Sequence, residues 1–327
     1  TILERVTPES HDWAEAQTHA VTGRILLDVK RSGAFKARGV KQGFKECRAT
    51  ADGPDFNYYS HVAKLQSVRT ALFREHRRNR RVALKDVATA YLQSISYDGF
   101  VKYVCFQHPV TKEWMYFRQH GPIYGEASAA VRWENTIGPW FEEQGFVRGS
   151  NERCVFYHEE RDLIVLLYVD DVYADGDEDD IAWIFDLLDS RFTCKPAEWL
   201  TEATPLDYLG QEVILTDTHI HLSMYSYIQD MVDSLELRSA RSATTPIATA
   251  VNPNTAPLDQ PHRKLFMVIM GCVGWLARQH GSPGRGICPL TCGTAHGIPY
   301  GLRPRRGQAH RSLSQAHGSP HPRGTDR

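Results

Sequence analysis

The most apolar run of the chain, residues 163–167, leads into the Tyr-Val-Asp-Asp sequence of residues 168–171. Consecutive aliphatic side chains predict a buried strand, so Asp170 and Asp171 fall in the turn that ends it. Upstream, residues 153–157 followed by the polar residues 158–162 predict the other arm of a hairpin. Two carboxylates are therefore expected on a rigid strand end, which is a favourable place for metal chemistry.

A third carboxylate, Asp86, lies at the end of a second predicted strand, residues 82–87. Two magnesium ions roughly 3.5–4 Å apart can stabilise the attacking and leaving oxygens of a phosphoryl displacement, and they need oxygen ligands from several directions. Magnesium keeps several waters and uses substrate phosphates, so few protein ligands suffice. Without metal, clustered carboxylates repel, which raises the pKa of at least one of them. The competing interpretation is a polar turn after a core strand, where Asp is common.

Seven segments together resemble the reverse transcriptase of copia-type long-terminal-repeat retrotransposons, in the order that this family has. They are residues 35–44 (FKARGVKQGF), 59–69 (YSHVAKLQSVR), 85–92 (KDVATAYL), 123–125 (IYG) with Trp133, 168–171 (YVDD), 208–210 (YLG) and 222–228 (LSMYSYI). Each segment alone is a weak signal, whereas the ordered set is a strong one.

The resemblance implies an α+β fold, the right-hand architecture of a polymerase with fingers, palm and a partial thumb or connection. Residues 1–81 would form a fingers-like segment and residues 82–215 an antiparallel palm sheet that carries the catalytic aspartates. Residues 216–280 would form thumb or connection material. The Gly-, Pro- and Arg-rich residues 281–327 have almost no aliphatic periodicity and predict a disordered tail. A reading-frame shift near residue 279 and a basic nucleic-acid-binding tail are alternative explanations of this segment.

By resemblance, Asp86, Asp170 and Asp171 match the catalytic, metal-binding aspartates of the palm. Tyr91 matches the aromatic position that closes the sugar pocket against a 2′-hydroxyl, the group that distinguishes RNA from DNA. Without Asp86 nearby, a half-buried structural aromatic would be the preferred interpretation of Tyr91.

Lys36 and Arg38 resemble the fingers cations that contact the triphosphate of the nucleotide. A solvated strand face is the alternative for this pair. Tyr124, Gly125 and Tyr168 match positions that contact template or primer.

The implied function is RNA-directed DNA polymerase, a nucleotidyltransferase that uses two Mg²⁺ or Mn²⁺ ions. Its partners would be deoxynucleoside triphosphates, an RNA or DNA template with a DNA primer, and other segments of a Pol polyprotein of which this chain would be a fragment. No stretch reads as a membrane span or a signal segment, so an intracellular location is expected, in a cytoplasmic virus-like particle or the nucleus by resemblance.

One departure from the family concerns the segment after Tyr124-Gly125. The family usually continues with Leu-Lys-Gln, whereas this chain has Glu126, Ala127 and Ser128. Loss of an amide and a cation with gain of an acid is expected to weaken the grip on nucleotide or template. A degenerate, catalytically inactive relic is therefore an alternative function. An unrelated metal-dependent phosphoryl-transfer enzyme or acidic cation-binding module is another.

Charge and cysteine content add little. Lys plus Arg number 38 and Asp plus Glu number 39, so the net charge does not argue for nucleic acid binding. A local basic cluster precedes the Asp86 strand and could track a nucleic acid backbone or form a solvated helix end: Arg74, Arg77, Arg78, Arg80 and Arg81. The odd number of scattered cysteines argues against a disulfide framework, and Cys288, Cys292 and His296 make only a weak zinc pattern.

Overall fold

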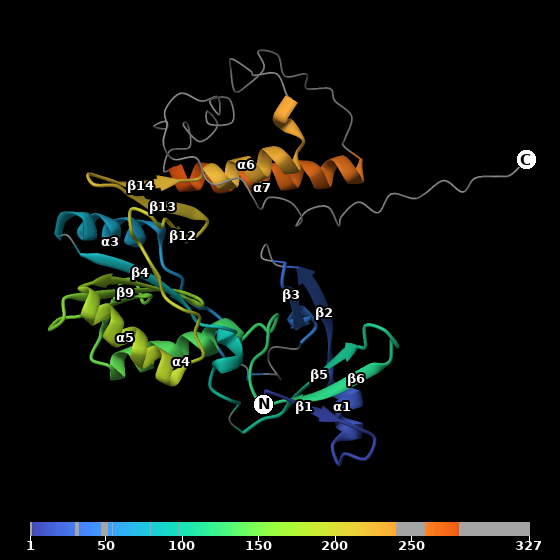
Figure 1. The fold of residues 1–327 in the computed structure, drawn as a ribbon. Helices are drawn as coiled ribbons and strands as arrows, with labels where there is room; N and C mark the ends of the chain where they lie inside the picture. The colour runs from blue at the N-terminus through green and yellow to red at the C-terminus, as the bar shows by residue number, and fades with distance from the viewer. Residues whose placement is uncertain are drawn as a thin grey trace, which may run out of the picture. The chain divides into compact units, whose positions relative to one another are not determined.

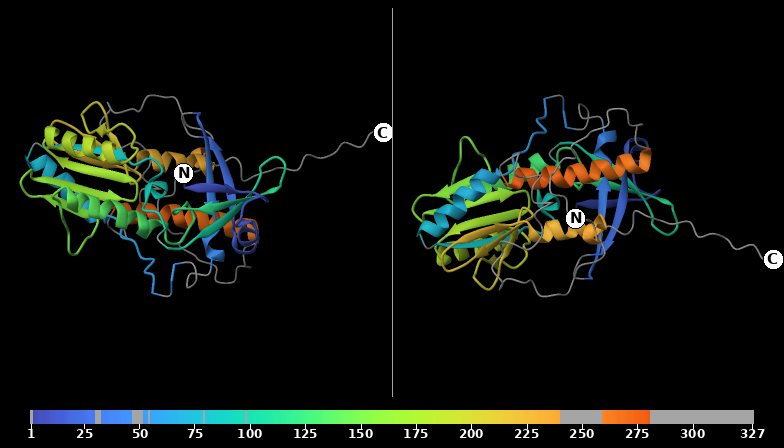
Figure 2. Two further views of the ribbon diagram at one scale, coloured as in Figure 1. Left: turned by 90° about the horizontal axis from the view of Figure 1, so that it is seen from below. Right: turned by 90° about the horizontal axis from the view of Figure 1, so that it is seen from above.

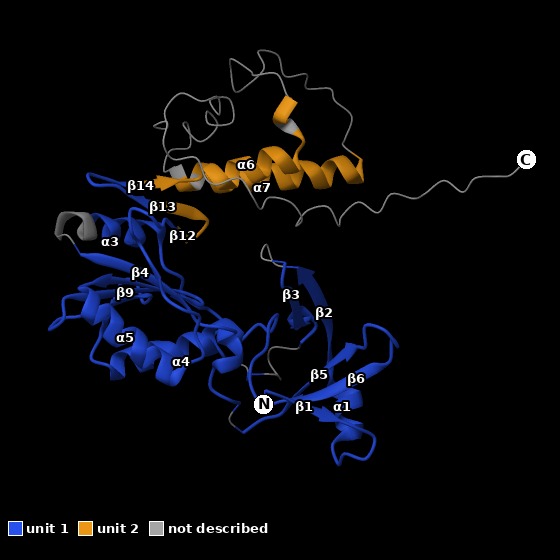
Figure 3. Ribbon diagram, in the orientation of Figure 1, with its two compact units in different colours: residues 1–206, 214–220 blue, residues 207–213, 221–327 orange. Residues whose placement is uncertain are grey.

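The computed structural model describes residues 2–29, 33–46, 52–53, 55–78, 80–97, 99–239 and 259–280. The chain divides into two compact units, which Figure 3 colours separately. Unit 1 comprises residues 1–206 and 214–220, and unit 2 comprises residues 207–213 and 221–327. Helices occur in the chain together with sheets whose strands are largely antiparallel, which agrees with the α+β prediction.

A six-stranded sheet forms the centre of unit 1. Its strands, in spatial order, are β11 (Glu198–Trp199), β4 (Arg81–Asp86), β10 (Asp171–Gly176), β9 (Leu163–Tyr168), β8 (Val155–His158) and β7 (Val147–Arg148). Every neighbouring pair is antiparallel. The predicted hairpin corresponds to β8 and β9, and the apolar run of residues 163–167 is a central strand, as its composition indicates.

Helices cover both faces of this sheet (Figure 1). Helices α4 (Ala129–Glu143) and α5 (Glu178–Arg191) lie on one face, and α3 (Leu65–Arg78) contacts β4, β9 and β10 on the other. The main core lies between the sheet and helices α4 and α5, because alternate strand residues such as Leu163, Val165 and Leu167 point towards them.

A second sheet of unit 1 contains strands from two distant parts of the sequence. Its order is β1 (Leu3–Val6), β6 (Trp114–Gln119), β5 (Lys102–Gln107), β2 (Val21–Val29) and β3 (Phe35–Lys41). Helix α1 (Trp13–His19) packs beside it, with Ala16 in a small core with Val6 and Tyr103. In both views of Figure 2 the blue strands lie beside the teal ones.

The predicted division at residues 81 and 82 therefore does not follow the sheets. Strands β5 and β6 fall within the range expected for the palm, yet they pair with β2 and β1. Strands β2 and β5 are parallel, and a parallel pair needs a long crossover connection. Strand β4 of the six-stranded sheet lies within that connection, which a local pattern along the sequence does not reveal.

Two of the arginines in the predicted basic cluster pair with acids of unit 1. The Arg80 side chain is buried, with Nε 3.0 Å from Oδ1 of the buried Asp175 and Nη1 2.9 Å from Oδ2 of Asp162. Arg81 Nε lies 3.3 Å from Glu178. Arg80 therefore does not fit the alternative in which it tracks a nucleic acid backbone, because its charge is used inside the fold.

The end of β3 lies against the Tyr124-Gly125 segment. Lys41 N–H donates to Tyr124 O at 2.8 Å, and Gly43 N–H donates to Gly125 O at 3.2 Å. Gly125 has a φ of +82°, and a Cβ at this position would lie 2.2 Å from Lys41 O. Glycine is therefore required here both by the backbone conformation and by the close approach.

We expect Gly125→Ala to lower the free energy of unfolding by about 1–3 kcal/mol more than Gly33→Ala does. Gly33 has the same φ of +82° but no atom within 4 Å of a Cβ, so it controls for backbone strain alone. Urea denaturation of the two variants measures the difference. Equal losses would mean that the approach of Lys41 does not constrain residue 125.

The C-terminal elements are a three-stranded sheet and a helix pair. The sheet has β12 (Leu206–Tyr208), β13 (Gln211–Leu215) and β14 (Ile220–Ser223) in that order. The helices are α6 (Tyr225–Ser234), followed by the 3-10 turn η3 (Leu237–Ser239), and α7 (Gln260–His280), with a core of Met224, Met231 and Leu276.

Two sequence predictions fall beyond the described residues. They are the tail over residues 281–327 and the pattern of Cys288, Cys292 and His296. None of the described helices combines the length and apolarity needed to cross a membrane.

Candidate active site

Asp86 and Asp171 are paired residues of two neighbouring strands, so their carboxylates begin from adjacent backbone positions. Asp86 ends β4, Asp171 begins β10, and the antiparallel register places the two residues opposite each other. Ala83 and Val172, which have the other strand parity, point into the core beneath α4 and α5. Because side chains alternate along a strand, both aspartates project from the opposite face of the sheet.

Asp170 lies in the two-residue turn that joins β9 to β10. Its carbonyl accepts a 2.8 Å hydrogen bond from the N–H of Val87, the residue after Asp86. The preceding carbonyl, of Val169, accepts a 2.6 Å hydrogen bond from the indole Nε1 of Trp133 on α4. The turn is therefore tied both to the strand that carries Asp86 and to a helix of the core.

The charges at this strand end influence one another. Burial raises the pKa of Asp170 above its ordinary value, and the negative charge of Asp86 raises it further. Lys195 and Arg38 act in the opposite direction but do not cancel the shift. The direction agrees with the repulsion that the sequence predicts for clustered carboxylates.

Lys195 is a site residue that the sequence reasoning missed. Its Nζ lies 2.6 Å from Oδ2 of Asp86, and its main-chain N–H donates to Asp86 O at 2.9 Å. Lys195 follows α5 and is distant in sequence from both aspartate segments, so no local pattern indicates the contact. The pairing of Val87 with Cys194 across an isolated β-bridge brings it there.

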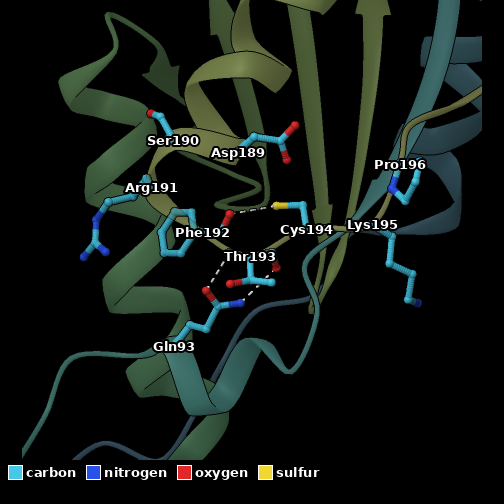
Figure 4. Close-up of a pocket in the computed structure, with 9 residues that line it drawn as sticks. All are labelled: Gln93, Asp189, Ser190, Arg191, Phe192, Thr193, Cys194, Lys195 and Pro196. Carbon is cyan, nitrogen blue, oxygen red and sulfur yellow. Dashed lines mark hydrogen bonds between the residues drawn. The ribbon is translucent and has the colours of Figure 1, made fainter. Parts of the chain in front are cut away.

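A groove lined by Gln93 and by residues 189–196 contains Lys195 (Figure 4). Hydrogen bonds in this groove join the segment before Lys195 to the residues that follow Asp86. The Gln93 side chain donates through Nε2 to Thr193 O at 3.0 Å and accepts at Oε1 from Thr193 N–H at 2.8 Å. Gln93 ends the 3-10 turn η2 (Ala90–Gln93), which also contains Tyr91. The hydrogen bonds between Gln93 and Thr193 therefore join the turn that carries Tyr91 to the segment that carries Lys195.

Tyr91, Tyr124 and Arg38 meet beside the aspartates. The ring centroids of the two tyrosines are 5.5 Å apart, and Arg38 Cζ lies 5.7 Å from the centroid of the Tyr124 ring. Burial raises the pKa of Tyr91, and the charge of Asp170 adds to this rise. Burial likewise raises the pKa of Tyr124, with Asp170 and Asp86 acting in the same direction and Arg38 opposing them. The structure thus brings together residues from three predicted segments.

The other predicted site residues lie around this cluster. Lys36 is two residues before Arg38 on β3, hence on the same face of that strand. Tyr168 pairs opposite Asp171 and packs partly on the main core. Gly125 is adjacent to Tyr124, and the contacts described above give it a packing role at the end of β3.

A different set of carboxylates has the spacing of a metal site. Among the described residues, oxygens of Glu46, Asp52 and Glu126 lie within 4.8 Å of one another, whereas the three aspartates do not form such a group. However, Lys102 Nζ is 2.7 Å from Glu126 and 2.9 Å from Asp52. Lys41 and Arg132 also pair with members of the set, so cationic side chains already match its charge.

The environment of Glu126 corrects part of the sequence interpretation. Its carboxylate is completely buried and accepts hydrogen bonds from Tyr97, Lys102, Gln119 and Ser128. The acid is therefore not presented to a phosphate, and the weaker grip expected for this segment depends on the lost amide and cation.

The aspartates fit magnesium through the chemistry of their donors. Asp86, Asp170 and Asp171 supply hard oxygen atoms and are only partly buried. One of these carboxylates already attracts a cation, the Lys195 ammonium.

Comparison with known proteins identifies the family. Residues 18–249, well over half of the chain, match the reverse transcriptase (RNA-dependent DNA polymerase) family. The chain belongs to this family. The predicted resemblance is confirmed, and an unrelated phosphoryl-transfer enzyme is excluded.

Its relatives include Pol polyproteins of plant transposons. The reverse transcriptase chain is 26% identical over 229 residues to the retrovirus-related Pol polyprotein from transposon TNT 1-94 of Nicotiana tabacum, covering 65% of this chain and 16% of that protein. It is 27% identical over 233 residues to the protein from transposon RE1 of Arabidopsis thaliana, covering 65% and 14%. The chain thus spans about a sixth of the length of these relatives.

Among solved structures, the chain is similar to telomerase from Candida albicans in complex with a fragment of telomeric RNA. The TM-score is 0.40 and the sequence identity 12%, over 72% of this chain and 53% of that chain.

Proposed function

We propose that this reverse transcriptase domain is an active RNA-directed DNA polymerase, which adds deoxynucleotides to the 3′-hydroxyl of a primer on an RNA or DNA template. The observation that supports it best is the pairing of Asp86 with Asp171 across β4 and β10, with Asp170 in the adjoining turn. Strand ends that are hydrogen-bonded to each other hold carboxylates at fixed relative positions, which metal-assisted phosphoryl transfer requires.

Asp86, Asp170 and Asp171 would hold two Mg²⁺ or Mn²⁺ ions in this proposal. Bound ions of this kind stabilise the charge on the attacking and leaving oxygens of phosphoryl transfer. The residues of the chain supply the positioning. The ring of Tyr91 would border the sugar of the incoming nucleotide, and the guanidinium of Arg38 would attract its triphosphate, with Lys36 beside it.

The template and primer would lie along Tyr124, Gly125 and Tyr168. The six-stranded sheet corresponds in this proposal to the palm of a right-handed polymerase, and the five-stranded sheet to its fingers. The five-stranded sheet carries Arg38 on β3, and the contact of Arg38 with Tyr124 supports a position of this guanidinium beside the aspartates. Other segments of a Pol polyprotein would be the natural protein partners.

Incorporation of a single nucleotide tests this function. The full chain is incubated with Mg²⁺, a labelled DNA primer on an RNA template, and each deoxynucleoside triphosphate in turn. We expect addition of the nucleotide complementary to the template base and of no other. Addition that ignores the template, or no addition by a folded protein, would contradict the proposal.

The inactive relic is the second candidate, supported by the altered residues 126–128. This alternative predicts binding of the primer–template without incorporation. Fluorescence anisotropy of a labelled primer–template, measured beside the incorporation assay, separates the two functions. If the protein binds without incorporation, the first change to test would be to restore the amide and the cation that the family has at these positions.

Replacing Tyr91 by valine is expected to reduce the preference for deoxynucleotides over ribonucleotides by about 10²-fold. The partly buried Tyr91 ring packs on Tyr124, which would hold it against the nucleotide sugar, so a 2′-hydroxyl would collide with it. Single-turnover incorporation of both nucleotide types measures the ratio. Tyr91→Phe keeps the ring and should keep the preference; a similar loss in this control would show that the hydroxyl, not the ring volume, discriminates.

A further inference from the structure

We propose that Trp133 is a positioning residue, which holds the turn at Val169 and Asp170 in the geometry that presents the aspartates. The inference rests on the proposed metal centre. Trp133 lies on α4, outside the strands that carry the carboxylates, and donates a hydrogen bond from Nε1 to Val169 O at 2.6 Å.

The turn has a backbone conformation that its own residue does not favour. Val169 has a φ of +58°, in the left-handed region. A β-branched residue is rarely found there, because its Cβ substituents crowd the following carbonyl. Such a conformation persists only when the surrounding structure determines it, and it commonly occurs at functional sites.

Hydrogen bonds from two separate elements determine this conformation. The carbonyl of Asp170 accepts from Val87 N–H at 2.8 Å, so the residue that follows β4 holds one side of the turn. The carbonyl of Val169 accepts from the Trp133 indole, so α4 holds the other. A partly buried carbonyl that loses its donor favours rearrangement towards another donor or water. Loss of the indole N–H would therefore release the strained side of the turn.

Packing fixes the indole in place. Trp133 is 2% exposed, and its ring lies edge-on to Phe192 with centroids 5.3 Å apart. Phe192 lies three residues before Lys195, which pairs with Asp86. A donor fixed in a close-packed core can hold a turn more tightly than a donor on a mobile surface chain.

The test uses the full chain and compares two tryptophans of one helix. Trp133→Phe removes the donor, whereas Trp140→Phe is the matched control. Trp140 lies two turns further along α4, is also buried, and packs edge-on against Phe192 at 5.6 Å. Replacing Trp133 by benzothienylalanine, which has sulfur in place of the indole N–H, removes the donor without leaving a cavity.

Mn²⁺ affinity, measured by electron paramagnetic resonance, is the first readout. We expect Trp133→Phe and the benzothienyl variant to weaken Mn²⁺ binding by roughly 10- to 100-fold, as loss of a group that orients a metal ligand does. Trp140→Phe should stay within about threefold of the wild type. Unchanged affinity in the benzothienyl variant, or equal weakening in Trp140→Phe, would overturn the inference.

Hydrogen exchange of the peptide that spans β9 and β10 is the second readout. We expect faster exchange around residues 169–171 in both Trp133 variants and not in Trp140→Phe. This readout needs no metal. Absence of Mn²⁺ binding by the wild type would contradict the proposed function. Faster exchange in the Trp133 variants would still support the inference that Trp133 holds the turn at Val169 and Asp170. Unchanged exchange in both Trp133 variants would overturn that hold, whatever the metal affinity.

Discussion

Replacing Asp170 by asparagine is expected to reduce template-directed incorporation by at least about 10³-fold, because several kcal/mol of transition-state stabilisation depend on the metal-binding carboxylates. The same change should not lower the free energy of unfolding at neutral pH. Asparagine has nearly the same shape but no charge, and Asp170 is partly buried near the like charge of Asp86. Single-turnover incorporation and urea denaturation in EDTA measure the two effects.

The pH dependence of stability follows from the raised pKa of Asp170. Burial first, and then Asp86, raise this pKa in the folded state, so the folded protein binds the proton more tightly than the unfolded chain does. Stability is therefore lost as the pH rises from the ordinary pKa of aspartate through the raised one. The free energy of unfolding of Asp170→Asn should therefore rise relative to that of the wild type as the pH increases through this window, and the difference should vanish at lower pH. Asp217→Asn, at an exposed position, is the control and should change neither property. Incorporation that survives in Asp170→Asn would remove Asp170 from the metal site.

Replacing Glu126 by glutamine is expected to lower the free energy of unfolding by about 3 kcal/mol at neutral pH. Removing one partner of a buried ion pair commonly costs about 3–5 kcal/mol. We expect the lower end of this range because Asp52 still faces Lys102, whose side chain is 4% exposed. Lys41, which is fully buried, keeps Glu46. Denaturation with urea measures the loss.

The loss should disappear in acid. Burial alone would raise the pKa of Glu126, but Lys41 and Lys102 outweigh it and hold this pKa below its ordinary value. The contribution of Glu126 is then fully present above the ordinary pKa of glutamate and is lost as the pH falls through the lower folded value. Glu142→Gln, at an exposed position of helix α4, should change stability by only a few tenths of a kcal/mol. A Glu126 variant with full stability and no polymerase activity would instead place this residue in the nucleotide site.

The sequence predicts the parts of the fold that local patterns determine. The apolar run of residues 163–167 contains no polar residue, which is typical of a buried central strand. It forms most of β9. Strand β4 also lies close to its predicted range, residues 82–87.

Pairing between distant segments is what the sequence does not reveal. Strands β5 and β6, which follow β4 in the sequence, pair with β2 and β1 in the five-stranded sheet, and nothing in their composition specifies those partners. The burial of Glu126 does not follow from the sequence, because its counterions, Lys41 and Lys102, come from other segments. Arg80 reads as part of a basic surface for the same reason, since Asp175 lies on β10.

The candidate site likewise contains residues that local patterns indicate and residues that only the packing of distant segments brings there. The three aspartates and Tyr91 follow from spacing and family resemblance, because each lies in a segment with a recognisable pattern. Lys195 and Trp133 were not assigned to the site, since their contacts with Asp86 and Val169 exist only after helices and strands have packed. A strained residue is also invisible in sequence, because Val169 is an ordinary strand residue until its φ is known.

Extension of a labelled DNA primer to the end of an RNA template is the most direct test of the proposed polymerase. The full chain is supplied with Mg²⁺ and all four deoxynucleoside triphosphates, and the products are separated by length. We expect stepwise extension by the wild type and none by Asp170→Asn. A folded wild-type protein that binds the primer–template and leaves the primer unextended would contradict it.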